Sequence, residues 1–247
     1  NFVRRANNNT GGFGNTSSPM AGAVNWAPTT PIYDEAGNLT PNDPTGSIKG
    51  NPVEFALNDN IYETNSLGGN GAFNYEIIKG LSLNIGYGLA YSNSQGKYFT
   101  ANLINNNPDA TRSSSESIFL QNTNTLNYNK VIGGIHNLTL TGVFEQQVMQ
   151  TDMFSTRAGG LLYPSFRYDN ITLASSISSG AYYEKQSIRS FIGRVNYSLK
   201  DRYLLTASIR SDGSSKFRGD NQYSTFPSVG AGWRISEESF MQNIDFI

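Results

Sequence analysis

Apolar and polar residues alternate along several stretches after residue 65, and this period of two constrains the fold more than any other feature. The apolar positions run from Phe73 to Ile77 and, after a short Lys-Gly link, resume from Leu81 to Tyr91. Successive side chains of a β-strand point to opposite faces, so the pattern predicts strands with one apolar and one polar face. The link at residues 79–80 is short enough to predict a β-hairpin.

The same pattern recurs in two further hairpins, with turns at Gly133-Gly134 and at residues 198–202, and in a last strand that reaches Ile235. We therefore predict about seven strands within residues 66–247. One end of each hairpin has a short turn, whereas the other end has long polar stretches at about 93–117, 150–182 and 212–226. Short turns at one end and long loops at the other are typical of outer-membrane β-barrels.

Residues 1–65 show little periodicity and contain many Gly, Pro and Asn residues, which mark turns and irregular backbone. We expect this region to be mostly one long extracellular loop. Its aromatic residues, among them Trp26 and Tyr33, favour a loop that packs on something.

Composition excludes several classes of protein. The 247 residues include 18 Lys and Arg, 19 Asp and Glu, one His and no Cys. A net charge of −1 gives no electrostatic footprint for nucleic acid, so no nucleic-acid partner is expected. The absence of Cys excludes disulfides and thiolate sites, and a single His excludes a multi-histidine metal site. We predict no metal and no cofactor.

A soluble β-sandwich would show the same alternation with its apolar face turned inward. The polar faces favour a barrel, because Arg194, Arg210 and Arg234 occur there among Ser, Thr, Asn and Gly, as in a hydrated lumen. Aromatic residues agree with this interpretation, since Tyr203 and Trp233 occupy apolar positions next to the short turns, where an interfacial girdle belongs. We therefore predict an all-β fold, a segment of a large antiparallel transmembrane β-barrel.

Two blocks of sequence, residues 190–217 and 226–241, resemble the SusC/RagA family of TonB-linked outer-membrane transporters. The first contains Ser190-Phe191-Ile192-Gly193-Arg194-Val195-Asn196-Tyr197, and the second contains Gly230-Ala231-Gly232-Trp233-Arg234-Ile235-Ser236-Glu237. The resemblance implies a barrel of about 22 strands that is closed by a plug. Neither a plug nor a TonB box is visible here, so we expect the 247 residues to be roughly a third of such a barrel.

The resemblance also implies function and partners. A member of this family imports a glycan or peptide nutrient across the bacterial outer membrane, under a SusD-like surface lipoprotein that acts as a lid. The TonB complex supplies energy through parts that this sequence does not contain. Outer-membrane lipid and an oligosaccharide or peptide substrate complete the expected partners, and no residue here decides between the two substrates.

Candidate site residues fall into two groups. Loop aromatics can stack on sugars or pack against peptide side chains, and packing within the loops or on the lid explains them equally well. These are Trp26, Tyr33, Tyr163, Phe166 and Tyr168. Polar residues predicted to face the lumen are Arg194, Asn196, Arg210 and Arg234, and for Arg194 and Arg210 we expect structural pairing rather than control of specificity.

Catalysis is not expected, because the sequence contains no Gly-x-Ser-x-Gly elbow and a triad would have to use His136, next to a tight turn. Two alternatives to the importer stay open. One is a surface β-domain that acts as an adhesin or binding protein, and the other is a purely structural outer-membrane barrel.

Overall fold

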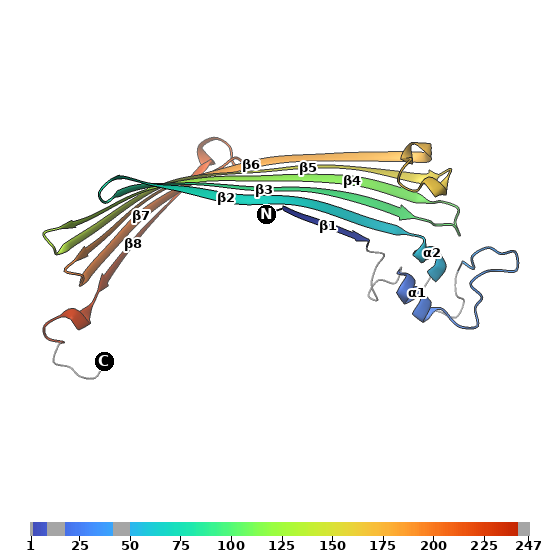
Figure 1. Ribbon diagram of the computed structural model, residues 1–247, viewed down its shortest axis with the longest axis horizontal. Coiled ribbons are helices and arrows are strands. Elements are labelled where there is room, and N and C mark those ends of the chain that lie inside the picture. The colour runs from blue at the N-terminus through green and yellow to red at the C-terminus, as the bar shows by residue number, and fades with distance from the viewer. Residues whose placement is uncertain (1, 9–17, 42–49, 242–247) are drawn as a thin grey trace. The chain divides into compact units, whose positions relative to one another are not determined.

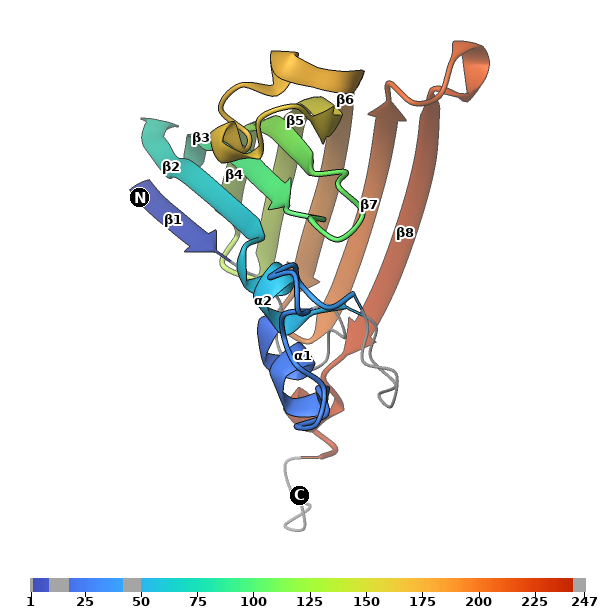
Figure 2. The ribbon, with the colours of Figure 1, turned by 90° about the vertical axis from the view of Figure 1, so that its right-hand side faces the viewer.

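A computed structural model describes residues 2–8, 18–41 and 50–241 of the chain. Its strands form one eight-stranded sheet in the order β1 to β8, so that each strand pairs with its neighbours in sequence (Figures 1 and 2). The strands are β1 Phe2–Asn8, β2 Asp59–Ile78, β3 Leu81–Thr100, β4 Asp109–Ile132, β5 His136–Leu161, β6 Ala174–Leu199, β7 Tyr203–Ser214 and β8 Tyr223–Trp233. The predicted all-β antiparallel fold is confirmed.

Strands β2 to β8 correspond to the seven predicted strands, but they are longer than the alternation indicated. The polar stretches 93–117 and 150–182, which we predicted to be loops, are largely strand, and only residues 101–108 and 162–173 connect the strands there. The boundaries were wrong because backbone hydrogen bonds to a neighbouring strand hold polar residues in a sheet as well as apolar ones. The last strand ends at Trp233, and a 3₁₀ helix, η4, follows at Ile235–Glu237.

The first 65 residues contain two short helices and a strand, β1, which the sequence pattern did not predict. Strand β1 pairs antiparallel with β2, with Phe2 opposite Leu67 and Asn8 opposite Ile61. The helices are α1, Pro19–Asn25, and α2, Pro52–Ala56. The described residues contain no helix with the length and apolarity needed to cross a membrane.

Each helix begins at a polar cap followed by proline, a combination that suits the first turn. The Ser18 side chain accepts a hydrogen bond from the backbone N–H of Ala21 at 3.1 Å, and Asn51 caps α2 in the same way. The helices pack closely, because Gly22 has no side chain and a Cβ there would lie 3.2 Å from atoms of Pro52.

The chain divides into two compact units, each formed by parts of the same long strands. The first contains residues 1–67, 91–117 and 151–184. Its small hydrophobic core lies at the ends of β3, β4 and β5, where Tyr168 and Ile171 of the β5–β6 connection pack against it. The buried core residues are Phe99, Ala101, Ala110, Ala158 and Leu161.

The second unit contains residues 68–90, 118–150 and 185–247, and it includes all the short turns. Gly80 has φ +83° between β2 and β3, and Gly133 and Gly134 have φ +58° and +71° between β4 and β5, so the turns need residues that tolerate left-handed backbone. The three predicted hairpin turns are confirmed.

The pairing of residues between β6, β7 and β8 shows which residues share a face of the sheet in the second unit. Val195 lies opposite Ala207, and Ala207 lies opposite Val229, so these apolar residues share one face. Asn196 lies opposite Thr206, which lies opposite Gly230 on the other face. We call these the apolar face and the polar face, although Leu204 and Phe226 lie on the polar one by register.

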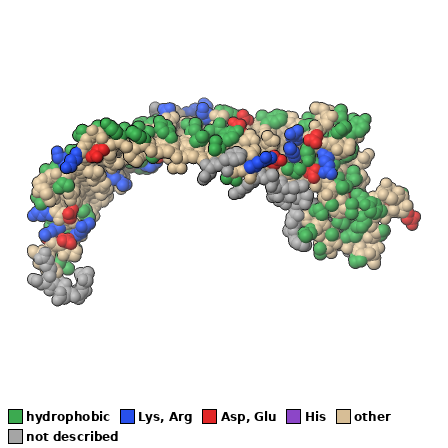
Figure 3. All heavy atoms as spheres, viewed as in Figure 1, with side chains coloured by type: hydrophobic (Ala, Val, Ile, Leu, Met, Phe, Trp, Pro, Cys, Tyr) green, Lys and Arg blue, Asp and Glu red, His purple; other side chains and the backbone are tan. Residues whose placement is uncertain are grey.

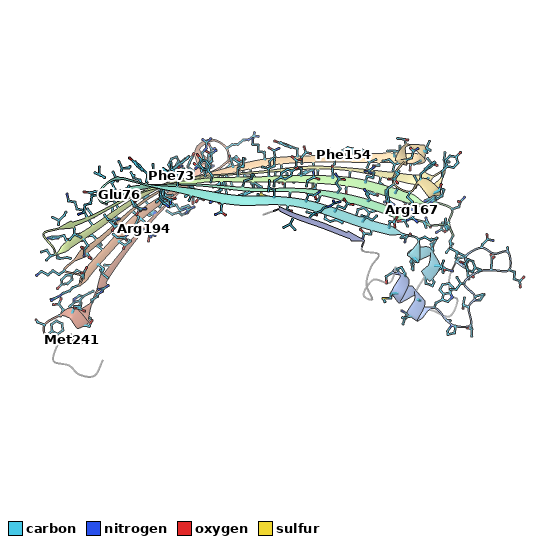
Figure 4. All side chains as sticks on the ribbon, in the orientation of Figure 1. Phe73, Glu76, Phe154, Arg167, Arg194 and Met241 are labelled. Carbon is cyan, nitrogen blue, oxygen red and sulfur yellow. The ribbon has the colours of Figure 1, made fainter. Side chains whose placement is uncertain are left out.

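The side chains of the apolar face are widely exposed, as Figure 3 shows along one side of the strands. Val229 is 76% exposed and Phe73 is 62% exposed. Phe73 has the parity of the apolar face and Glu76 that of the polar face on β2 (Figure 4). An exposed apolar surface of this extent indicates contact with lipid or protein rather than water.

Candidate functional site

The polar face of β6 and β7 carries a network that fixes two of the predicted lumen residues. Arg210 donates from Nε to both carboxylate oxygens of Asp212, at 2.9 and 2.7 Å, and from Nη2 to the Ser190 hydroxyl at 3.3 Å. Asn196 accepts a hydrogen bond from the Thr206 hydroxyl at 2.9 Å. Arg210 is therefore held by residues of its own and the neighbouring strand.

Arg194 and Arg234 are placed differently from Arg210. Arg194 lies opposite Ser208 on the polar face and forms no ion pair within the ranges that the structure describes. Arg234 follows the end of β8 and precedes η4, so strand alternation does not assign its side chain to either face. Its backbone N–H donates to the carbonyl of Arg202 at 2.8 Å.

Three of the predicted aromatic residues lie in the β5–β6 connection, residues 162–173. Two of the three have exposed side chains. Tyr163 and Phe166 are exposed and contact each other edge to face, with ring centroids 6.2 Å apart. Tyr168 instead packs against the core around Phe99. Burial raises the pKa of the Tyr168 phenol, and the nearby Asp59 carboxylate raises it further.

The Arg167 side chain links this connection to strands β2 and β3. Its guanidinium pairs with the Asp59 carboxylate and lies over the Phe99 ring, with Cζ 5.2 Å from the ring centroid. The backbone of Arg167 has φ +48°, an unusual conformation for a residue with a side chain. The ion pair and the ring contact together explain why arginine occupies this position.

Trp26 and Tyr33, the remaining candidates, lie in residues 18–41. The Trp26 indole donates from Nε1 to the carbonyl of Thr30 at 2.9 Å, so its polar group is engaged within the segment. Tyr33 is half exposed and lines a cavity of about 670 Å³ with residues that include Leu39, Val53 and Leu103. Tyr33 is therefore the better placed of the two to contact a ligand.

A tight turn beside Tyr33 is organised by Asp34. Its Oδ1 accepts from the backbone N–H groups of Asn38 at 2.7 Å and Ala36 at 3.0 Å. The Asn38 N–H, more than any other group, holds the pKa of the Asp34 carboxyl below its usual value. Asp34 thus stays ionised and shapes the rim of the Tyr33 cavity.

A second cavity in the first unit, of about 570 Å³, lies among residues that sequence reasoning missed. Arg157 donates to Asp109 at 2.9 Å within it, and Asn106, Gly160 and Ser175 contribute to its polar lining. Arg157 and Asp109 are 48 residues apart and belong to stretches that we predicted to be loops. No local motif connects two such residues, so only the strand pairing shows that they meet.

Across the described parts of the chain, no group of three or more His, Asp or Glu side chains could hold a metal ion. The site consists of polar cavities, exposed rings and paired charges, which can bind a polar ligand and guide it.

The two-faced antiparallel sheet, with an exposed apolar face and a polar one, defines the wall of a membrane β-barrel. A family model described as "TonB dependent receptor-like, beta-barrel" matches residues 2–241. The chain belongs to this family, and its predicted resemblance to SusC/RagA transporters is confirmed.

Curated relatives agree with this assignment. TonB-dependent receptor P26 of Formosa agariphila is 33% identical over 231 residues, which cover 90% of this chain and 23% of the relative. TonB-dependent receptor SusC of Bacteroides thetaiotaomicron is 46% identical over 67 residues, 27% of this chain and 7% of the relative. The chain spans about a quarter of the length of the curated relatives that it matches most extensively.

Solved structures show the same fold. A structure described as the RagAB peptide transporter superposes with a TM-score of 0.71 over 85% of this chain and 24% of that chain, at 18% identity. A RagAB peptide importer in an "open-open" state gives the same TM-score over 90% of this chain and 26% of that chain, at 20% identity.

Proposed function

We propose that this chain forms part of the wall of an outer-membrane transporter that imports a glycan or peptide nutrient. The observation that carries the proposal is the family match over residues 2–241, on a sheet whose apolar side chains are exposed. A strand crosses the hydrocarbon core with about 9–11 residues. Strands such as β5, with 26 residues, are long enough to cross it and to extend beyond it.

Orientation follows from the turns. In outer-membrane barrels the short turns face the periplasm and the longer connections face the cell exterior. The turns at residues 79–80, 133–135 and 200–202 then face the periplasm, and the connections at residues 101–108 and 162–173 lie at the outer mouth, on the cell exterior. The apolar face contacts lipid, and the polar face with Arg194, Asn196 and Arg210 contacts the lumen.

Substrate reaches the outer mouth first, and the exposed candidates lie there. Tyr33, Tyr163 and Phe166 offer flat rings to a sugar or a peptide side chain, while the cavity around Arg157 and Asp109 offers hydrogen-bond donors and acceptors. Trp26 supports its segment through the hydrogen bond of its indole, and Tyr168 supports the β5–β6 connection by packing on the core. A SusD-like lipoprotein acts as the lid, and TonB supplies the energy.

Uptake by cells tests this function directly. A strain that lacks the complete receptor would be complemented with it and supplied with labelled oligosaccharides or labelled peptides, with and without an uncoupler of the proton gradient. We expect uptake of one substrate class that depends on the receptor and stops with the uncoupler. Surface binding that persists without uptake would favour an adhesin, and passive uptake would favour a structural pore.

A further inference from the structure

The short turn between β2 and β3 is held tightly against β4. The backbone N–H of Asn129 donates to the carbonyl of Gly80 at 2.7 Å. Gly80 has φ +83°, and a Cβ at this position would collide with the carbonyl oxygen of Asn129. Because Lys79 and Lys130 are the chain neighbours of these two residues, the close approach brings both lysines to the same part of the rim.

Side-chain hydrogen bonds determine which face of β4 carries Lys130. Thr139 donates to the side chain of Asn129 and Thr141 to that of Asn127, both at 2.8 Å, so both asparagines lie on the polar face with the threonines of β5. Tyr128 and Lys130 alternate with them and therefore belong to the apolar face.

The residues of β2 that precede Lys79 also alternate between the two faces. The side chain of Asn84 donates to that of Asn74, which places Asn74 on the polar face of β2. Tyr75 and Ile77 then occupy the apolar face, and Lys79 follows β2 in the turn, two residues beyond Ile77. Two cations thus lie at the short-turn end, Lys130 on the apolar face of β4 and Lys79 in the turn that packs against β4.

Neither lysine is neutralised by an acidic side chain. Both are exposed, and none of the ion pairs formed within residues 2–8, 18–41 and 50–241 includes them. Glu76, the acidic residue nearest in sequence, has the parity of the polar face, and its Oε1 accepts from the N–H of Gly80 at 3.3 Å. The rim at this turn therefore carries two exposed positive charges that form no ion pair among the described residues.

The neighbouring residues have the character of a membrane interface. Tyr75 is 54% exposed and stacks on Phe73, with ring centroids 6.4 Å apart and an interplanar angle of 12°. Ile77 and Ile132, the latter with the parity of Lys130, are also exposed. Tyrosine rings at the level of lipid headgroups, with lysines that extend beyond them, match the preferred depths of both residue types in a bilayer.

We propose that Lys79 and Lys130 bind the phosphate of an anionic phospholipid in the periplasmic leaflet of the outer membrane, with the acyl chains along Tyr75 and Ile77. The proposal rests on the proposed membrane location of the chain. An ammonium group binds phosphate as a compact point charge, and the two lysines are complementary to a single headgroup. Such a lipid fixes the depth of the β2–β4 turns at the membrane surface.

Lipid binding to the complete receptor in detergent tests the site, with phosphatidylglycerol as the probe and native mass spectrometry as the measurement. A lysine near an anionic lipid surface contributes roughly fivefold in affinity, so K79Q/K130Q should bind about twentyfold more weakly. K79R/K130R should retain binding. The control K97Q/K185Q removes the same charge from Lys97 in β3 and Lys185 in β6, and it should bind like the wild type.

Two results would overturn the proposal. One is equal phosphatidylglycerol affinity of the wild type and K79Q/K130Q, and the other is displacement of the lipid by inorganic phosphate at similar concentration, which would indicate a site for a soluble anion. Membrane fractionation of the same variants separates this outcome from failure of the proposed function. A receptor that resides in the outer membrane but binds lipid without these lysines overturns the lipid site alone.

Discussion

The hydroxyl of Tyr203, at the start of β7, donates a hydrogen bond of 2.7 Å to Glu238, which lies 35 residues further along the chain. The same carboxylate accepts from the indole of Trp233 at 3.1 Å and from the guanidinium of Arg202 at 3.1 Å. The Tyr203 and Trp233 rings stack with their centroids 6.4 Å apart. Glu238 thereby ties the segment after β8 to the aromatic residues at the short-turn end.

This arrangement predicts a pH-dependent stability. The hydrogen bonds, above all the one from Tyr203, hold the pKa of Glu238 below its usual value. A carboxyl group with a lowered pKa in the folded state stabilises the fold above its unfolded pKa of about 4.3, and this contribution is lost as the pH falls through the folded value. We expect E238Q to lower the thermal unfolding temperature at neutral pH, with a difference that closes in acid.

Thermal unfolding of the complete receptor in detergent over a pH series measures this difference. E237Q is the matched control, because Glu237 is the exposed neighbour of Glu238. A wild-type advantage over E238Q that stays constant from neutral pH to acid would contradict the role of the ionised carboxylate.

A charge on the apolar face should impair membrane insertion. A Cβ at Gly193 would lie 3.6 Å from Cγ2 of Ile209, which is ordinary contact, so space does not forbid a side chain there. We expect G193D to reduce insertion, because a charge that faces hydrocarbon costs on the order of 2 kcal/mol. S208D, opposite Arg194 on the polar face, should insert normally, and heat-modifiable mobility of the folded barrel distinguishes the two. Equal insertion of both would mean that the faces are assigned the wrong way round.

Removal of Arg167 should loosen the β5–β6 connection. R167A loses the ion pair with Asp59 and the contact with the Phe99 ring, which together are worth about 1–3 kcal/mol in a half-buried setting. We expect faster proteolytic cleavage and faster hydrogen exchange within residues 162–173. R157A removes an exposed arginine from the same unit and should leave that segment protected, whereas equal protection in R167A would argue against the role of Arg167.

Asn51 should prove important for the fold of the segment around α1 and α2. It is fully buried, donates to the carbonyls of Ile32 and Thr40 at 2.8 and 3.2 Å, and accepts from the N–H of Val53 at 2.9 Å. N51A leaves these groups unpaired and should destabilise the segment by about 2–4 kcal/mol. Hydrogen exchange of residues 27–41 measures the effect, with N38A as an exposed control, and unchanged exchange in N51A would refute it.

Sequence patterning predicted the faces of the second unit and its turns, because the alternation from Phe73 onward and the glycines at 80, 133 and 134 are local signals. It missed the full length of strands such as β4 and β5, since polar strand segments with polar neighbours lack a period of two. Helix caps at Ser18-Pro19 and Asn51-Pro52 were visible in the sequence, yet helices of this length fall below what apolar periodicity detects.

The sequence predicted the face of some candidate residues, but it did not predict the ion pairs between distant residues. Arg210 and Asn196 could be assigned to the polar face because their strands alternate cleanly, and their exact partners required the register. The pairs Arg157–Asp109 and Arg167–Asp59 could not be predicted, because only the order and length of the strands bring such distant residues together.

The central claim is that one face of this sheet meets lipid and the other meets a wet lumen, and single-cysteine labelling tests it most directly. The 247 residues contain no Cys, so V229C and S228C introduce adjacent probes of opposite faces on β8. In outer-membrane vesicles a charged maleimide should modify S228C, whereas V229C should react only with a lipid-soluble maleimide, although Val229 is 76% exposed in the isolated sheet. Rapid modification of V229C by the charged reagent in a folded receptor, with S228C protected, would contradict the account.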